Sequence, residues 1–196
     1  MIYQIKISLK DIRPEIWRRV HLDSKTTLYE LHHIIQIAMN WSNYHLYQFD
    51  IKDPFNEVRI RYGNPGLLDD PDAIDDRSIL ISYMLINEKE ILNYEYDFGD
   101  GWNHLIKLEK IIHIGEIILP KCIGGKLNTP PEDCGGVHGF YNFLEIMTNK
   151  KDREYKSTKK WYGEDYDPDF CDISKINEDL ENLHDFIKEY EKAWEI

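Results

Sequence analysis

The residue types that could do chemistry gather in one stretch of the chain, Tyr94–Gly139. It contains two Gly-rich segments, YDFGDGWNH (Tyr96–His104) and PPEDCGG (Pro130–Gly136). Carboxylates, an imidazole, a thiol and aromatic rings are groups that bind polar ligands or transfer protons. The candidate binding residues are Tyr96, Asp97, Asp100, Trp102, His104, Glu132, Asp133 and Cys134. The sequence therefore predicts that the functional surface lies in this stretch.

Catalysis would use these side chains in one of two ways. A carboxylate of the first segment could pair with Glu132 or Asp133 as a general acid and base between aromatic walls. Cys134 could act as a nucleophile beside a histidine base, although neighbouring carboxylates raise the pKa of a thiol and weaken it. A hydrolase is therefore the alternative function. Because acidic residues in Gly-rich segments also accept hydrogen bonds from turn amides, binding without catalysis is favoured.

The same stretch holds potential metal ligands. His104, Cys134 and His138 lie among the acidic residues. The two spacing patterns that are specific for zinc, CxxC and HExxH, are both absent from the sequence. A turn or a packed interior accounts for the same residues. We therefore expect neither a metal ion nor a cofactor.

One basic stretch runs from Lys150 to Lys160. Six Lys and Arg residues accompany Asp152 and Glu154 there, which gives a local charge of 6 − 2 = +4. Such a stretch could contact a phosphate backbone, so a nucleic-acid accessory protein is a third hypothesis. A solvated helix face with internal ion pairs is the commoner arrangement.

The composition bounds the partners and the compartment. The 196 residues include 24 Lys and Arg and 36 Asp and Glu, a net charge of −12, which repels nucleic acid and anionic lipid. No apolar run approaches the ~18 residues of a membrane span, and the N-terminus lacks a signal-peptide pattern. Three cysteines do not make a disulfide framework. We expect a cytoplasmic protein that binds a protein or a small ligand, without membrane or nucleic-acid contact.

Periodic segments predict the elements that position this surface. Tyr3–Leu9 alternates apolar and polar residues, which is typical of a half-buried strand, and Ile16–Leu22 predicts a second strand. Thr27 and Glu30 have the spacing of a capping box, and the helix that they begin ends near Asn40. Its predicted buried stripe comprises Leu28, Leu31, Ile35, Ala38 and Met39. A hairpin followed by a covering helix resembles the start of a β-grasp fold.

Further strands and loops follow this start. Strands are predicted at His45–Ile51 and Glu57–Gly63, followed by a solvated acidic loop at Gly63–Arg77 and a short helix at Ile81–Lys89. Alternating residues on both sides of a GDG turn then predict a β-hairpin. Its two strands are Glu90–Phe98 and His104–Ile112, and the buried face of the first comprises Leu92, Tyr94, Tyr96 and Phe98.

The last third of the chain is predicted to be loop and helix. Pro120–Gly136 is rich in Gly and Pro and predicts an ordered loop. Apolar stripes at Phe140–Met147 and Ile176–Trp194 predict two helices. The fold class is therefore α+β, with a β-grasp-like hairpin–helix start, further antiparallel strands and C-terminal helices. The chain forms a single domain, residues 1–196, or divides into a β-grasp-like part, residues 1–63, and a hairpin-and-helix part, residues 78–196.

Five stretches of the sequence resemble the Ri-plasmid ORF-three-like family. They are IRPEIWRRVHL, LYELHHIIQIAMNWSNYHLYQF, YEYDFGDGWNHLIKLEKI, PKCIGGKLNTPPEDCGGVHGFYNFLE and DPDFCDISKINEDL, and they are spread over residues 12–180. Some members of this family carry the label TnpR as passenger proteins of an insertion element, so the resemblance implies a link to mobile elements. It implies no catalytic residues. A resolvase would need a serine nucleophile among arginines in a basic protein, and this acidic sequence shows no such arrangement.

Overall fold

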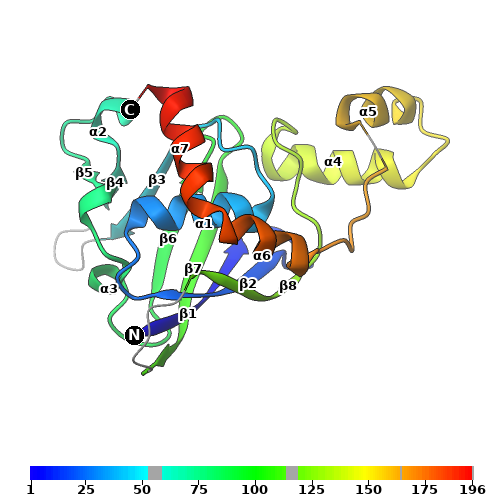
Figure 1. The fold of residues 1–196 in the computed structure, drawn as a ribbon. Helices are drawn as coiled ribbons and strands as arrows, with labels where there is room; N and C mark the ends of the chain where they lie inside the picture. The colour runs from blue at the N-terminus through cyan, green and yellow to red at the C-terminus, as the bar shows by residue number, and fades with distance from the viewer. Residues whose placement is uncertain (53–58, 114–118, 164, 196) are drawn as a thin grey trace.

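The computed structural model describes residues 1–52, 59–113, 119–163 and 165–195 (Figure 1). Within them, eight strands form one sheet in the order β5-β4-β3-β6-β7-β1-β2-β8. The strands are β1 (Ile2–Leu9), β2 (Trp17–Asp23), β3 (Tyr47–Lys52), β4 (Arg59–Gly63), β5 (Ile74–Asp75), β6 (Ile91–Tyr96), β7 (Trp102–Ile112) and β8 (Lys121–Lys126). The helices are α1 (Leu28–Met39), α2 (Pro65–Leu68), α3 (Ile81–Met84), α4 (Gly136–Thr148), α5 (Tyr155–Tyr162), α6 (Ile173–Glu181) and α7 (Leu183–Trp194). The fold class is α+β, as predicted.

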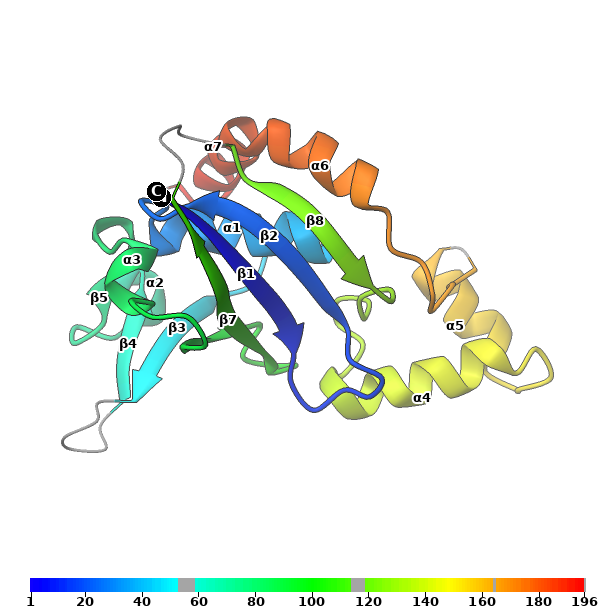
Figure 2. The same ribbon diagram turned by 90° about the horizontal axis from the view of Figure 1, so that it is seen from below.

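The β1–β2 hairpin and α1 form as the sequence predicts. Ile5 and Ile7 of β1 are fully buried. Figure 2 shows from below that α1 lies across one face of the sheet. Thr27 accepts a hydrogen bond from the Glu30 amide, and the Glu30 carboxylate accepts one from the Thr27 amide. Asn40 ends the helix in a left-handed conformation. The capping box therefore fixes where α1 begins. The end of the helix at Asn40 places the following loop at one end of the sheet.

Helix α1 is buried on more than the predicted stripe. His32, His33 and Gln36 are fully buried although they lie outside it. The reason is that α6 and α7 pack against the face of α1 that is turned away from the sheet (Figure 1). Tyr190 of α7, for example, makes ring contacts with both histidines. The helix is thus a middle layer, and its polar residues must find partners inside the protein.

The β6–β7 hairpin confirms the predicted strands and corrects one residue. Leu92, Tyr94 and Tyr96 are fully buried, whereas Phe98 is 44% exposed. Strand β6 ends at Tyr96, and Asp97 takes a left-handed conformation with φ of 57°. This turn breaks the alternation of strand residues, so Phe98 leaves the buried face. Neighbouring strands of the sheet pair antiparallel, and the β4–β5 pair is the exception, being parallel.

Several predicted segments differ in detail. The predicted loop Pro120–Gly136 contains the edge strand β8, which pairs with β2. The predicted terminal helix is interrupted at Asn182, which separates α6 from α7. The predicted acidic loop Gly63–Arg77 contains α2 and β5, and it buries Asp76 against the Tyr47 hydroxyl at 2.6 Å. The predicted helix Ile81–Lys89 ends at Met84. In the strand predicted at 57–63, residues 57 and 58 lie outside the described residues.

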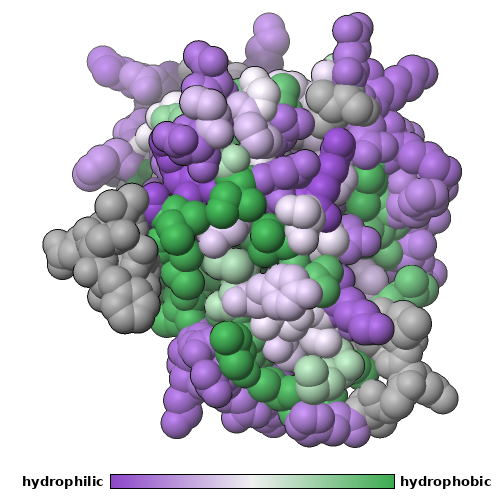
Figure 3. Space-filling view, turned by 90° about the vertical axis from the view of Figure 1, so that its left-hand side faces the viewer, coloured by the Kyte–Doolittle hydropathy of each residue, from purple (hydrophilic) through white to green (hydrophobic). Residues whose placement is uncertain are grey.

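Two finer expectations stay predictions. Strand β1 lies between β2 and β7 and pairs antiparallel with both. The β-grasp-like arrangement of the start of the chain stays a prediction. One sheet contains strands from both predicted parts of the chain, residues 1–63 and residues 78–196. The division into domains likewise stays a prediction. No helix of the described residues is both long and apolar enough to cross a membrane. On the face that carries α2 and α3, apolar patches alternate with hydrophilic ones (Figure 3).

Candidate functional site

Three loops meet at the end of the sheet where β6 turns into β7. The first follows α1, the second is the DFGDG turn, and the third is the PPEDCGG segment before α4. The Trp41 indole Nε1 donates to the Pro130 carbonyl at 2.9 Å, and the Tyr96 hydroxyl donates to Glu132 Oε1 at 2.6 Å. The two Gly-rich segments of the sequence therefore lie side by side, with the loop after α1 as a third wall.

Glycine and aspartate set the shape of this junction. The Asp97 carboxylate accepts a hydrogen bond from the Gly99 amide within the turn at 2.9 Å. Asp100 Oδ2 accepts one from the Gly135 amide at 3.0 Å, which ties the turn to the third loop. A Cβ atom at Gly136 would lie 2.4 Å from the Asp100 carbonyl oxygen. A side chain at that position is excluded, so the GG pair is what allows the two segments to pack.

Neutral donors hold the carboxylates of the third loop. Glu132 accepts hydrogen bonds from the Tyr96 hydroxyl at 2.6 Å and from the Ser42 amide at 2.7 Å. Asp133 Oδ2 accepts one from the Tyr44 hydroxyl at 2.6 Å. Burial raises the pKa of both tyrosines, and the bonds to these carboxylates raise it further. The phenols therefore stay protonated, and they position the two negative charges without cancelling them.

A histidine that sequence reasoning missed also reaches this cluster. His45 Nε2 lies 3.2 Å from Asp133 Oδ1 and 3.6 Å from Asp97 Oδ2. One potential ligand atom from each of the three residues lies within 4.8 Å of the other two. His45 was predicted as the first residue of a strand, but it precedes β3 and belongs to the loop after α1. No local motif links it to the other two residues, which come from different loops.

A pocket of about 310 Å³ opens beside these carboxylates. Its lining includes Trp41, Tyr44, Glu132, Asp133, Trp161 and Tyr162. Trp161 and Tyr162 belong to α5, which is held against α4 by edge contacts between their rings and Phe143. Trp161 is 52% exposed. In the sequence, the one sign that α5 could belong to the site is its two aromatic residues directly after the basic stretch. Only the packing of α5 on α4 brings these residues to the acidic loops.

Three of the predicted site residues, Trp102, His104 and Cys134, are not available for catalysis. Trp102 and His104 are buried in the core. His104 Nδ1 donates to the Trp102 carbonyl oxygen at 2.9 Å, and burial lowers the pKa of His104 to about 4. Burial, followed by the charge of Asp100, raises the pKa of the Cys134 thiol to about 12. The structure therefore brings Tyr96, Asp97, Asp100, Glu132 and Asp133 together but forms no activated Cys–His pair from these residues.

The cluster is negative, and no Lys or Arg within the described part of the chain forms an ion pair with it. Among the ion pairs between described residues, His45 is the one basic side chain within 4 Å of Asp97 or Asp133. The Lys and Arg ion pairs of these residues lie elsewhere, for example Arg19 with Glu109 across the open face of the sheet. Several carboxylates at one end of the molecule thus produce a concentrated negative field.

Comparison with known proteins supports one family. Residues 1–175 match the family described as plasmid pRiA4b ORF-3-like protein. An uncharacterized protein, y4hQ, of Sinorhizobium fredii is 31% identical over 184 residues, which are 93% of this chain and 92% of that protein. The crystal structure of a protein of unknown function, MM3350, from Methanosarcina mazei Go1 is similar with a TM-score of 0.77 and 34% identity, covering 88% of this chain and 95% of that one. The chain belongs to the plasmid pRiA4b ORF-3-like protein family.

Proposed function

We propose that the protein is a binding module that recognises a positively charged organic group in the pocket beside Glu132 and Asp133. The observation that carries this proposal is the way in which the two carboxylates are held. Their hydrogen-bond donors are phenols and a backbone amide, which are neutral. Each carboxylate therefore keeps its negative charge and a fixed orientation at the mouth of the pocket. A bound cation would supply the missing countercharge.

The aromatic wall favours the same class of ligand. The faces of Trp, Tyr and Phe rings attract guanidinium and ammonium groups. Trp41, Tyr44 and Trp161 line the pocket together with the carboxylates. A volume of about 310 Å³ lies at the lower end of the range of small-ligand pockets, which suits an arginine or lysine side chain of a partner protein or a small amine. The ligand is thus expected to insert one cationic group.

The two alternative functions have less support. A hydrolase that uses a Cys–His pair needs an activated thiol, but the pKa of the Cys134 thiol is raised and His104 is enclosed in the core. A nucleic-acid accessory role would rest on Lys150–Lys160, where Lys159 pairs with Asp165 and Arg153 with Glu154. The acidic pocket also lies beside α5, which carries part of this stretch, and its charge opposes a phosphate backbone.

Calorimetric titration with N-acetyl-arginine amide tests the proposal, because this probe carries one guanidinium and no other charge. N-acetyl-glutamine amide is the uncharged control ligand. We expect binding of the first and none of the second, with an affinity that falls as salt is added. Glu132→Gln and Asp133→Asn should each weaken the binding at least about tenfold, in line with the 1.5–3 kcal/mol of a hydrogen bond to a charged group.

The matched control variant is Glu145→Gln, which makes the same change on the exposed part of α4. It should bind the probe as the unchanged protein does. Equal affinity in Glu132→Gln, Asp133→Asn and the unchanged protein would rule out the pocket as the site. The absence of any heat with the arginine probe at low salt would rule out recognition of a guanidinium group.

A further inference from the structure

We infer that His45, Asp97 and Asp133 form a binding site for a divalent first-row transition-metal ion at the edge of the pocket. The three residues come from the three loops that meet there, and two of them, His45 and Asp97, do not line the pocket itself. This site is separate from the proposed recognition of an organic cation, although Asp133 is shared. It also revises the expectation from the sequence, which counted Asp97 and Asp133 among the potential ligands but not His45 and found no metal motif.

The distances suit coordination of one ion. Zinc binds imidazole nitrogen and carboxylate oxygen at about 2.0–2.2 Å, so two ligand atoms of a tetrahedral site are about 3.4 Å apart. His45 Nε2 is 3.2 Å from Asp133 Oδ1 and 3.6 Å from Asp97 Oδ2. All three ligand atoms lie within 4.8 Å of one another. The Asp133 side chain is half exposed, so the centre between the three ligand atoms can be reached from solvent.

The orientation of the ligand atoms is a second, independent observation. His45 Nε2 is buried and makes no hydrogen bond, although two carboxylate oxygens lie close to it. The side chain of Asp97 is only 9% exposed, and its Oδ1 is occupied by the Gly99 amide. Its Oδ2 is the atom that faces His45. A buried imidazole nitrogen and an oxygen of a buried carboxylate thus lie 3.6 Å apart without a hydrogen bond between them, as two ligands of one metal ion would.

The surrounding contacts would orient these ligands. Asp97 is fixed by the Gly99 amide, and Asp133 is fixed by the Tyr44 hydroxyl. Hydrogen bonds of this kind are the usual outer support of metal-binding carboxylates. A single imidazole with two carboxylates favours Zn²⁺, Co²⁺ or Mn²⁺ over Mg²⁺ and Ca²⁺, which prefer oxygen ligands alone. Three protein ligands leave further coordination positions for water or a ligand oxygen.

Titration of the metal-stripped full chain with Zn²⁺ in a calorimeter, and with Co²⁺ followed by its visible absorption, tests the inference. We expect one equivalent of either ion to bind, with Zn²⁺ the tighter of the two, and no binding of Mg²⁺ at the same concentration. Asp97→Asn and His45→Gln should each weaken binding by about 100-fold or more, because removal of outer-shell partners alone costs 10–100-fold. Asparagine tolerates the left-handed backbone at position 97 and can still accept the Gly99 amide, so this variant should fold.

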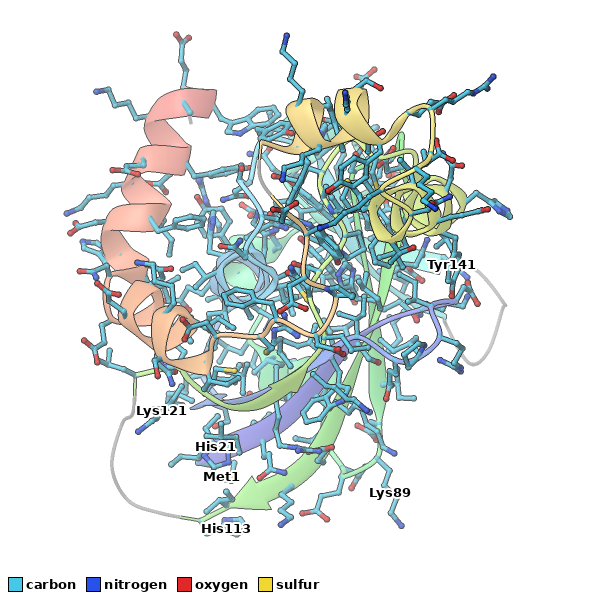
Figure 4. All side chains as sticks on the ribbon, turned by 90° about the vertical axis from the view of Figure 1, so that its right-hand side faces the viewer. Met1, His21, Lys89, His113, Lys121 and Tyr141 are labelled. Atoms are coloured by element: carbon cyan, nitrogen blue, oxygen red, sulfur yellow. The ribbon has the colours of Figure 1, made fainter. Side chains whose placement is uncertain are left out.

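Two control variants separate this site from adventitious binding. Asp185→Asn removes an exposed carboxylate of α7, outside the three loops. His21→Gln removes a histidine at the opposite end of the sheet, which Figure 4 shows near Met1 and His113. Both should bind Zn²⁺ as the unchanged protein does. The inference is overturned if the unchanged protein binds no ion, or if Asp97→Asn and His45→Gln bind Zn²⁺ with unaltered affinity and stoichiometry.

Two variants distinguish a failure of the metal site from a failure of the proposed recognition of an organic cation. Asp97 does not line the pocket, so Asp97→Asn should lose the metal ion and still bind N-acetyl-arginine amide. Glu132 is not one of the three ligands, so Glu132→Gln should lose the arginine probe and still bind Zn²⁺. Loss of both activities in Asp97→Asn, with an unchanged circular dichroism spectrum, would contradict the assignment of two separate sites.

Discussion

Two polar regions of the molecule meet at strand β6 and differ in how their polar groups are satisfied. On the α1 side, the Tyr94 hydroxyl lies 2.7 Å from His32 Nδ1 and 3.0 Å from Gln36 Nε2. His32 Nε2 in turn lies 2.6 Å from Asn43 Oδ1. On the loop side, Glu132 and Asp133 accept hydrogen bonds from tyrosines and a backbone amide. The first region is built from neutral groups, whereas the second is built around charges.

The hydrogen-bond directions of the inner network are determined by chemistry. Asn43 Oδ1 can only accept, so His32 Nε2 carries the proton and His32 Nδ1 accepts from the Tyr94 hydroxyl. Asn43 Nδ2 then donates to His33 Nδ1 at 2.9 Å. Burial lowers the pKa of His32, and it lowers that of His33 to about 3. Both imidazoles are therefore neutral at physiological pH, and the network holds α1 on the sheet without any net charge.

The difference indicates which region is structural and which is functional. The inner network is neutral and interlinked, although His33 Nε2 and Gln36 Oε1 find no partner among the described residues, and such buried networks contribute to specificity of packing. Carboxylates that keep their charge at a pocket mouth repel one another and contribute little to folding. Such groups are characteristic of sites that bind a ligand at some cost to stability. The predictions below separate the two regions by measuring stability and binding in the same variants.

The largest effect on stability is expected for His32→Ala. The change creates a cavity between α1 and the sheet and removes the acceptor of the Tyr94 hydroxyl proton and the donor to Asn43 Oδ1. We expect the free energy of unfolding in urea to fall by about 4 kcal/mol. A loss below about 1 kcal/mol would show that the inner network does not hold the two layers together.

The next effect concerns pH. Burial depresses the folded-state pKa of His104 to about 4, below its unfolded value near 6.5. The neutral form is therefore favoured by folding, and this stability is present above pH 6.5 and is lost as the pH falls toward 4. When the pH falls from 6.5 to 4, the free energy of unfolding of His104→Phe should therefore decrease less than that of the unchanged protein. We expect the difference to be about 3 kcal/mol, at 1.36 kcal/mol per pKa unit. Denaturant titrations at four pH values in this range would measure the difference, and parallel curves would refute it.

Tyr94→Phe should have a smaller effect. It removes the hydroxyl between His32 and Gln36 but leaves the ring and its packing in place. Because two buried partners lose a hydrogen bond, we expect the free energy of unfolding to fall by about 2 kcal/mol. Binding of the arginine probe should be unchanged, since Tyr94 does not line the pocket. Weaker binding in a fully folded variant would mean that the two regions are coupled.

The smallest effect on stability is expected for Asp133→Asn. The residue is half exposed, and asparagine can still accept the Tyr44 hydroxyl. We expect the free energy of unfolding to change by no more than about 0.5 kcal/mol, the usual range for surface changes, while the affinity for the arginine probe falls. Thermal unfolding and calorimetric titration of one preparation would measure both. A strong loss of stability here would place Asp133 with the structural residues.

The sequence predicts well those elements that local patterns specify. The alternation in β1 and the capping box at Thr27 are both present in the structure. β8 was missed because KCIGGK has two glycines and little alternation, and it becomes a strand only by pairing with β2. α1 was predicted with one buried stripe because nothing local shows that α6 and α7 cover its other face. Tertiary contacts decide these features.

The sequence predicts the loops of the candidate site but only some of its residues. Its acidic residues stand out in the two Gly-rich segments, and the structure brings these segments together. His45 and Trp161 were missed because each lies in a segment with another apparent role, a strand and a basic helix. Trp102 and His104 were included because they adjoin the turn, although strand alternation directs both into the core. The sequence thus locates the loops but not the direction of every side chain.

The most direct test of the central claim, that the acidic end of the sheet binds a cation, uses the indole N–H signals of the five tryptophans. N-acetyl-arginine amide is added to the ¹⁵N-labelled protein, and each signal is followed by nuclear magnetic resonance. We expect the signals of Trp41 and Trp161, which line the pocket, to shift together. Those of Trp17, which packs against Arg19 on β2, and of Trp102 in the core should stay in place. A shift of Trp17 without Trp161, or no shift at all, would contradict the account.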